Sequence, residues 1–284
     1  MNHSSTPAIF ADHAQSRLIK ANQVIFFVCG RPFLLLLALV SFSFNRAALA
    51  GGMLPPPPVV RDEAGGQALA EQMRASMPEK DSAIHGALLI NSGKTKTTIP
   101  VVCEVKLHEG TWETIYQAEA TPASGAERLD VIHSTNGPNR YLYARAAKPG
   151  APLPEPGPVS PADLEAPFAG SDYSLGELGL EFLHWPGQCE LGEEMRLGQA
   201  CNVLESTNSQ KGGMVRIRSW IDTKSLGVLV ADAYDSGGNR IKEFSLDSKS
   251  FKKDARGHWQ LEEMGIRNLK TRSRTDLKFD VPKN

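Results

Sequence analysis

The stretch of sequence that decides the fold is residues 172–186, which read DYSLGELGLEFLHWP. If this segment is helical, Leu175, Leu178 and Phe182 share one face, so it predicts a short apolar helix. Its two glycines each lower helix stability by roughly 1 kcal/mol, which suits a segment that can move as a lid. An ordinary core helix would show the same pattern.

Short segments with strand character follow the helical segment at roughly ten-residue spacing. The last of them places apolar residues at every second position, as a strand with one wet face does. This spacing predicts a meandering antiparallel sheet that curls. A sheet curled around an apolar helix favours a container over an enzyme. The expected strands are Met214–Asp222, Gly227–Tyr234, Arg240–Leu246, His258–Ile266 and Thr271–Val281.

The sequence before this region predicts one helix and a first block of strands. Leu69, Met73 and Met77 recur at four-residue spacing in Arg61–Met77, and Pro78 should end that helix. The expected strands of this block are Ser82–Ile90, Ile99–His108, Thr111–Ala120, Glu127–His133 and Arg140–Ala146.

Residues 147–161 are rich in proline, which excludes a helix or a central strand. Both a domain linker and a long surface loop fit this composition. Five strands and one helix would make a thin core on their own. The sequence therefore favours one sheet through both blocks, within a single domain over residues 61–284.

The first 50 residues predict a secretory signal peptide. Arg31 precedes the apolar run Phe33–Val40, and Ala48-Leu49-Ala50 is a cleavage site of the A-x-A type. The apolar run is shorter than the roughly 20 residues of a bilayer span, although an uncleaved anchor is the alternative. We expect cleavage after Ala50 and a periplasmic mature protein. Residues 51–60 carry four consecutive prolines and predict a disordered leader.

The formal net charge of −1 argues against nucleic-acid binding and against docking on an acidic membrane surface. Three cysteines would remain after cleavage. Cys189 and Cys201 flank the probable hairpin Glu190–Ala200, so a disulfide between them is one interpretation. Two small buried side chains are the other. Cys103 lies in an apolar run and fits the core.

Residue patterns for catalysis are missing from the sequence. Seven histidines are scattered, and none has a metal-ligand spacing with cysteine or acidic residues. No G-x-S-x-G nucleophile elbow occurs. We therefore expect a protein with no enzymatic activity, no cofactor and no metal.

Three short motifs resemble the outer-membrane lipoprotein-sorting family, the LolA/LolB-like group, in its uncharacterised exported branch. They are Phe168-Ala169-Gly170-Ser171-Asp172-Tyr173-Ser174, then Trp220-Ile221-Asp222, and Tyr234-Asp235-Ser236-Gly237-Gly238-Asn239-Arg240-Ile241-Lys242. The resemblance covers residues 168–281 well and residues 62–146 only in outline.

The resemblance implies an open antiparallel half-barrel of about eleven strands, with helices over its concave face. It also implies shielding of the acyl chains of a lipid or lipoprotein from water. Carrier members hold the closed lid with an arginine, and the motifs do not place that arginine here. An envelope sensor or adaptor that binds a protein partner with the same half-barrel is the alternative function.

The residues that we expect to line the apolar cavity come from the helical segment and from three strands. They are Leu175, Leu178, Phe182, Trp220, Val230, Leu277 and Phe279. Alternation alone does not say which face of each strand is concave.

Overall fold

The computed structural model describes residues 61–93, 95–135, 137–209, 213–246, 250–253 and 259–280. The predicted signal peptide and the proline-rich leader lie outside the described residues.

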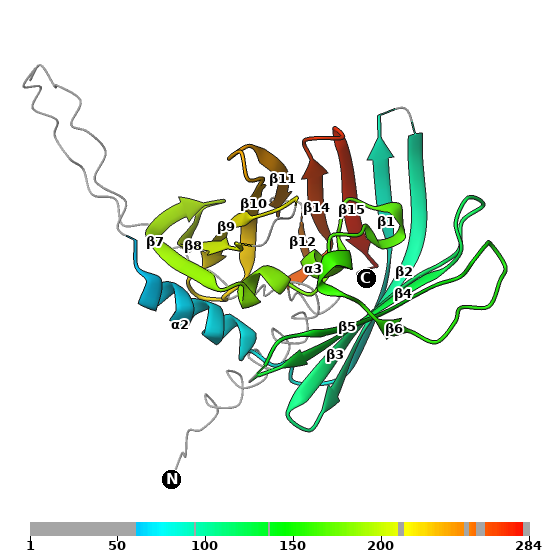
Figure 1. Ribbon diagram of the computed structural model, residues 1–284, viewed down its shortest axis with the longest axis horizontal. Coiled ribbons are helices and arrows are strands. Elements are labelled where there is room, and N and C mark those ends of the chain that lie inside the picture. Colours follow the sequence, from blue (N-terminus) through cyan, green and yellow to red (C-terminus); the bar gives the residue numbers. More distant parts are fainter. Residues whose placement is uncertain are drawn as a thin grey trace, which may run out of the picture.

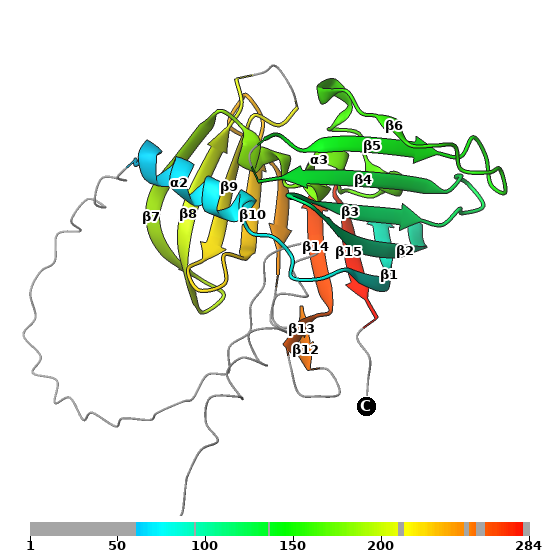
Figure 2. The ribbon, with the colours of Figure 1, turned by 90° about the horizontal axis from the view of Figure 1, so that it is seen from below.

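Thirteen strands form one antiparallel sheet, in the order β6-β5-β4-β3-β2-β1-β15-β14-β11-β10-β9-β8-β7. The sheet curls strongly but does not close, with β3–β6 on one side of the molecule and β7–β10 on the other (Figures 1 and 2). The expected open antiparallel half-barrel is confirmed. The sheet has thirteen strands where we expected about eleven, and one of the thirteen, β6, has only two residues. The strands are β1 Ser82–Ser92, β2 Thr95–His108, β3 Thr111–Ala118, β4 Glu127–Ser134, β5 Arg140–Arg145, β6 Gly157–Pro158, β7 Gly187–Arg196, β8 Gln199–Thr207, β9 Arg216–Asp222, β10 Val228–Tyr234, β11 Arg240–Ser245, β14 Glu263–Asn268 and β15 Ser273–Phe279.

Strands from before and after the proline-rich segment belong to the same sheet. The join is the pair β1 and β15, in which Leu88 lies opposite Leu277. The proline-rich segment itself contributes only β6, which pairs with β5 at the sheet edge. The expected strand His258–Ile266 is divided in two. Its first part is β13, Trp259–Leu261, which pairs with β12, Phe251–Lys253, in a separate small sheet.

The first helix of the described residues, α2, spans Glu63–Arg74 and packs against the edge strand β7 and its neighbour β8. It begins at Asp62, whose carboxylate accepts a hydrogen bond from the Gly65 N–H at 2.8 Å, as an N-cap does. The helix ends before Met77, which the sequence pattern had included. Its buried residues Leu69 and Met73 lie on the face that the spacing predicted.

The expected helix over residues 172–186 is not continuous. The structure has α3 at Leu175–Leu178 and the 3-10 turn η4 at Glu181–His184, and between them Leu180 has a left-handed φ of 53°. A left-handed residue interrupts the hydrogen-bond ladder of a right-handed helix. Gly176 and Gly179 weaken the helix further, because glycine loses more backbone entropy on folding than other residues do. Two further 3-10 turns, η2 at Pro161–Asp163 and η3 at Phe168–Gly170, precede α3.

The close contact of α2 with β7 depends on Gly66, which has no side chain. A Cβ atom at this position would lie 2.5 Å from the Cys189 backbone. We expect Gly66→Ala to lower the free energy of unfolding by about 1–3 kcal/mol, because the helix must move away from the sheet. Gly157→Ala is the matched control, since its Cβ would meet open space. Urea denaturation of both variants checks this, and equal midpoints would contradict the packing of α2.

A buried carboxylate links Arg61, just before α2, to the strands β8 and β9. Glu205 on β8 accepts hydrogen bonds from Arg61 at 3.0 Å and from Arg218 at 2.9 Å, and Arg216 lies 3.5 Å away. Burial raises the pKa of Glu205, but the hydrogen bonds from Arg218 and Arg61 outweigh it, so the pKa lies below its ordinary value.

The lowered pKa of Glu205 predicts a loss of stability in acid. A carboxyl group whose pKa is lower in the folded state stabilises the fold above its unfolded pKa, about 4.5. That contribution is lost as the pH falls through the folded pKa. Glu205→Gln should therefore lose less stability than the wild type between pH 7 and pH about 3. Urea midpoints at both pH values check this, with Glu104→Gln at an exposed ion pair as the control. An unchanged acid sensitivity would refute the role of Glu205.

Candidate functional site

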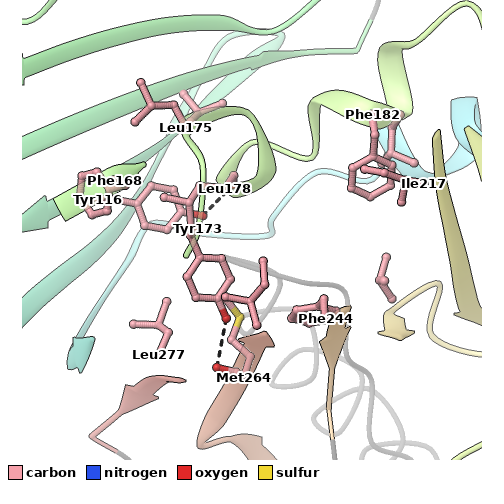
Figure 3. Close-up of a cluster of buried hydrophobic side chains, with 14 of the residues drawn as sticks. Tyr116, Phe168, Tyr173, Leu175, Leu178, Phe182, Ile217, Phe244, Met264 and Leu277 are labelled. Atoms are coloured by element: carbon pink, nitrogen blue, oxygen red, sulfur yellow. Dashed lines mark hydrogen bonds between the residues drawn. The ribbon is translucent and has the colours of Figure 1, made fainter. Parts of the chain in front are cut away.

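Residues 168–185, here called the covering segment, lie across one face of the curled sheet. Figure 3 shows Phe182 of η4 beside Ile217 of β9. Tyr173 of the same segment lies next to Met264 of β14, with Leu277 of β15 and Phe244 of β11 on its two sides. We call the sheet face that the segment contacts the inner face. Two tyrosines attach the segment to it. The Tyr116 hydroxyl donates to the Leu178 carbonyl at 3.0 Å, and the Tyr173 hydroxyl donates to the Met264 carbonyl at 3.1 Å (Figure 3).

Five of the seven residues predicted to line a cavity lie at this contact or on the inner face. Leu175, Leu178 and Phe182 are buried in the covering segment, and Leu277 and Phe279 are buried on β15. They belong to one hydrophobic core.

Strand register places the other two, Trp220 and Val230, on the outer face. They lie opposite each other across β9 and β10, and their neighbours Ser219 and Ala231 form the next pair. Ala231 lines a small cavity between the covering segment and the inner face. Successive side chains of a strand point to opposite faces, so Val230 points away from that cavity. The Trp220 indole donates to Glu194 at 2.7 Å on the outer face. These two residues therefore leave the candidate set.

A small apolar cavity remains between the covering segment and the inner face. Its volume is about 30 Å³, enough for about one or two water molecules. Ligand pockets measure roughly 300 Å³ or more, so this cavity has no room for an acyl chain. The cavity could accept a chain only if the covering segment moves. The lining residues are Tyr173, Glu177, Phe182, Ile217, Ala231, Ala233, Lys242, Phe244 and Ile266.

A buried polar cluster fastens the start of the covering segment to β15. The Asp172 carboxylate accepts hydrogen bonds from the Ser273 and Thr275 hydroxyls, at 2.5 and 2.9 Å. The Asp172 backbone N–H also donates to the Thr275 hydroxyl at 2.9 Å. All three residues are buried, so each bond is protected from competition by water.

An ion pair fastens the segment to β11. The Lys242 ammonium donates to Glu177 at 2.7 Å and to the Asp172 carbonyl at 2.8 Å. Glu177 also accepts from the Ser174 N–H at 2.8 Å, within the capping box that starts α3. Lys242 therefore contacts the covering segment on both sides of the Ser174 N-cap, at Asp172 before α3 and at Glu177 within it.

A surface groove of about 460 Å³ runs along the outside of the covering segment. It shares Glu177 and Phe182 with the inner cavity, so these two side chains separate the apolar interior from the groove. The groove is more polar, with Glu165, Glu181 and His184 among its walls. Burial raises the pKa of Glu181, and burial lowers the pKa of His184 to about 4.

The hairpin of β7 and β8 contains both cysteines of the expected pair, but the two are not opposite each other in the strand register. Cys189 lies opposite Glu205 and Cys201 opposite Glu194, roughly 15 Å apart along the strand. Both are free and buried, as is Cys103. The structure therefore agrees with the second interpretation of Cys189 and Cys201, in which they are small buried side chains and not a disulfide.

Sequence reasoning did not select Tyr173, Asp172 and Lys242 as site residues, although all three lie in motifs that it quoted. Polar residues embedded in an apolar segment were the available signal. Their partners Ser273 and Thr275 are about a hundred positions away, and only the fold brings them together.

In the described ranges, no group of three or more histidine, cysteine, aspartate or glutamate side chains could hold a metal ion. None of the helices among the described residues has the length and apolar character needed to cross a bilayer.

Comparisons with solved structures agree on the fold. The chain is similar to a domain described as an outer membrane lipoprotein-sorting protein from Vibrio parahaemolyticus, with 18% identity and a TM-score of 0.62 over 77% of this chain and 92% of that one. A DUF1329 family protein from Desulfovibrio piger gives 19% identity and a TM-score of 0.60, with the same coverages. A LolA superfamily protein from Nitrosomonas europaea gives 13% identity and a TM-score of 0.50 over 78% of this chain and 94% of that one.

No curated protein matches the sequence. A family model described as "Uncharacterized protein" matches residues 115–283, which is more than half of the chain. The chain therefore belongs to that family, and its fold is an open half-barrel similar to those of the three solved structures.

Proposed function

We propose that this protein is exported to the periplasm and binds a lipid or an acylated lipoprotein, without enzymatic activity. The acyl chains would lie on the inner face of the sheet, in the space that the covering segment fills in the closed form. The observation that carries this proposal is the apolar cavity beneath a segment of broken helical turns.

The energies involved are compatible with a lid that opens. Burying an acyl chain contributes about 0.8 kcal/mol for each CH₂ group. Opening the whole covering segment would expose six large buried side chains, at about 1.5–3 kcal/mol each. They are Phe168, Tyr173, Leu175, Leu178, Phe182 and Leu183. A chain of about 16 carbons contributes roughly 13 kcal/mol, which is of the same order as the apolar contacts that the segment gives up.

A fluorescent acyl probe tests the proposal on two neighbouring residues of β10. Ala231 lines the cavity, so Ala231→Trp should fill the acyl site and weaken probe binding at least tenfold. Val230→Trp places the same side chain on the outer face and should leave binding within about twofold. Probe binding that is unaffected by Ala231→Trp, or no binding by the wild type, would refute the proposal.

A protein-binding envelope sensor or adaptor is the second candidate. It is favoured by the exposed hydrophobic residues Met195 and Leu197 near the β7–β8 turn, which are 67% and 54% exposed. Contiguous exposed apolar surface often marks a protein contact, and these two side chains are two positions apart at one turn. If no acyl probe binds, pull-down from an envelope fraction with the wild type and with Met195→Ser/Leu197→Ser would test this function. Loss of the same partner in the variant would support it.

A further inference from the structure

We propose that Lys242 is the headgroup receptor of the acyl site, and that the ligand is an amphiphile with an anionic head. This inference rests on the proposed function and specifies its ligand class. In the closed form Glu177 occupies the position of that anion on the Lys242 ammonium.

Lys242 and Glu177 are the charged residues among the nine that line the cavity, and they come from different parts of the fold. Lys242 lies on β11, in the wall of the sheet, while Glu177 lies in the covering segment. The Asp172 carbonyl, the second acceptor of the Lys242 ammonium, also belongs to the covering segment.

Movement of the covering segment would therefore separate Lys242 from both acceptors. The ammonium group would remain on an apolar wall that includes Ile217, Phe244 and Ile266. When the chain of a ligand covers this wall, the ammonium is again partly removed from water, and a cation in that position is unfavourable unless an anion pairs with it. A ligand whose carboxylate or phosphate replaces Glu177 restores that pair, while its chain replaces the apolar side chains of the segment.

The position of the ion pair fits an amphiphile that has its tail inside and its head at the surface. Glu177 borders both the inner cavity and the outer groove. The side chain of Lys242 is 19% exposed and that of Glu177 is 12% exposed, so the pair lies at the boundary between the apolar interior and water. An ordinary surface ion pair has no apolar cavity behind it, whereas this one does.

Binding of four probes to the full chain as exported tests the inference. The probes have 16-carbon chains and differ in their heads: hexadecanoate, hexadecyl phosphate, hexadecanol and hexadecyltrimethylammonium, each below its micelle concentration at pH 8. The wild type should bind at least one of the two anions at least tenfold more tightly than hexadecanol, and the cation more weakly than hexadecanol. The anion that binds more tightly distinguishes a carboxylate source from a phosphate source.

Lys242→Met should reduce the preference for an anion over hexadecanol to about twofold or less, and Lys242→Arg should retain most of it. Lys278→Met removes an ion-paired lysine from β15 that does not line the cavity, and should leave the preference unchanged. If Lys242→Met is poorly folded, Lys242→Met/Glu177→Gln removes both charges and should show the same loss.

Two results overturn the inference and are distinguishable. If hexadecanol binds and the wild type shows no anion preference, or Lys242→Met keeps it, Lys242 is not the headgroup receptor while the acyl site stands. If none of the four probes binds, the proposed function fails together with the inference.

Discussion

Asp172→Ala is expected to tighten the binding of an acyl probe about tenfold or more while it lowers the free energy of unfolding by roughly 2–4 kcal/mol. The carboxylate accepts hydrogen bonds from the buried Ser273 and Thr275 hydroxyls, and a hydrogen bond to a charged group contributes about 1.5–3 kcal/mol. These bonds exist only when the covering segment is closed.

The opposite signs of the two effects follow from population shift. A ligand that binds only the open form has an apparent affinity reduced by the small fraction of molecules that are open. Weakening the closed form by 1.4 kcal/mol raises that fraction tenfold. An ordinary core residue would not behave in this way, because its loss destabilises the fold without favouring a binding-competent form.

Fluorescence titration and urea denaturation of the same preparation check this prediction. Asp163→Ala is the matched control, because Asp163 also accepts a serine hydroxyl, from Ser160 at 2.6 Å, but at an exposed site. It should change neither quantity appreciably. Weaker probe binding by Asp172→Ala, in a variant that remains folded, would contradict the role of the covering segment as a lid.

Leu277→Ala is expected to lower the free energy of unfolding by about 2–5 kcal/mol, the second large effect. Leu277 is 2% exposed on β15, in the cluster that Tyr173 and Met264 share (Figure 3). Its truncation leaves a cavity beneath the covering segment that the surrounding residues only partly refill.

Leu197→Ala is the control for Leu277→Ala, because the same substitution at a 54% exposed leucine should stay within about 0.5 kcal/mol. Thermal and urea unfolding measure both variants. Similar small losses for the two leucines would mean that the packing in Figure 3 does not stabilise the protein in solution.

The strands were the most predictable part of the fold. Apolar runs and turn residues located β1 to β5 to within a few residues, and β2 alternates most regularly between buried and more exposed positions. The division of His258–Ile266 between β13 and β14 was not predicted. That change of partner depends on contacts with β12 and β15 that no local pattern encodes.

The site was only partly predictable, for two physical reasons. The apolar spacing of Leu175, Leu178 and Phe182 identified the covering segment, although its broken helix was missed. Trp220 and Val230 were misplaced because alternation defines two faces of a strand and does not say which one is concave. Asp172 and Lys242 act through partners that are distant in sequence, and the fold alone brings those partners together.

The measurement that tests the central claim most directly is native mass spectrometry, with lipid extraction, of the protein purified from an envelope fraction. We predict a co-purifying acyl species whose mass is recovered in the extract and whose occupancy falls in Ala231→Trp but not in Val230→Trp. A bare polypeptide mass, with no uptake of added hexadecanoate or a synthetic lipopeptide, would contradict the acyl-binding account and favour the protein-binding alternative.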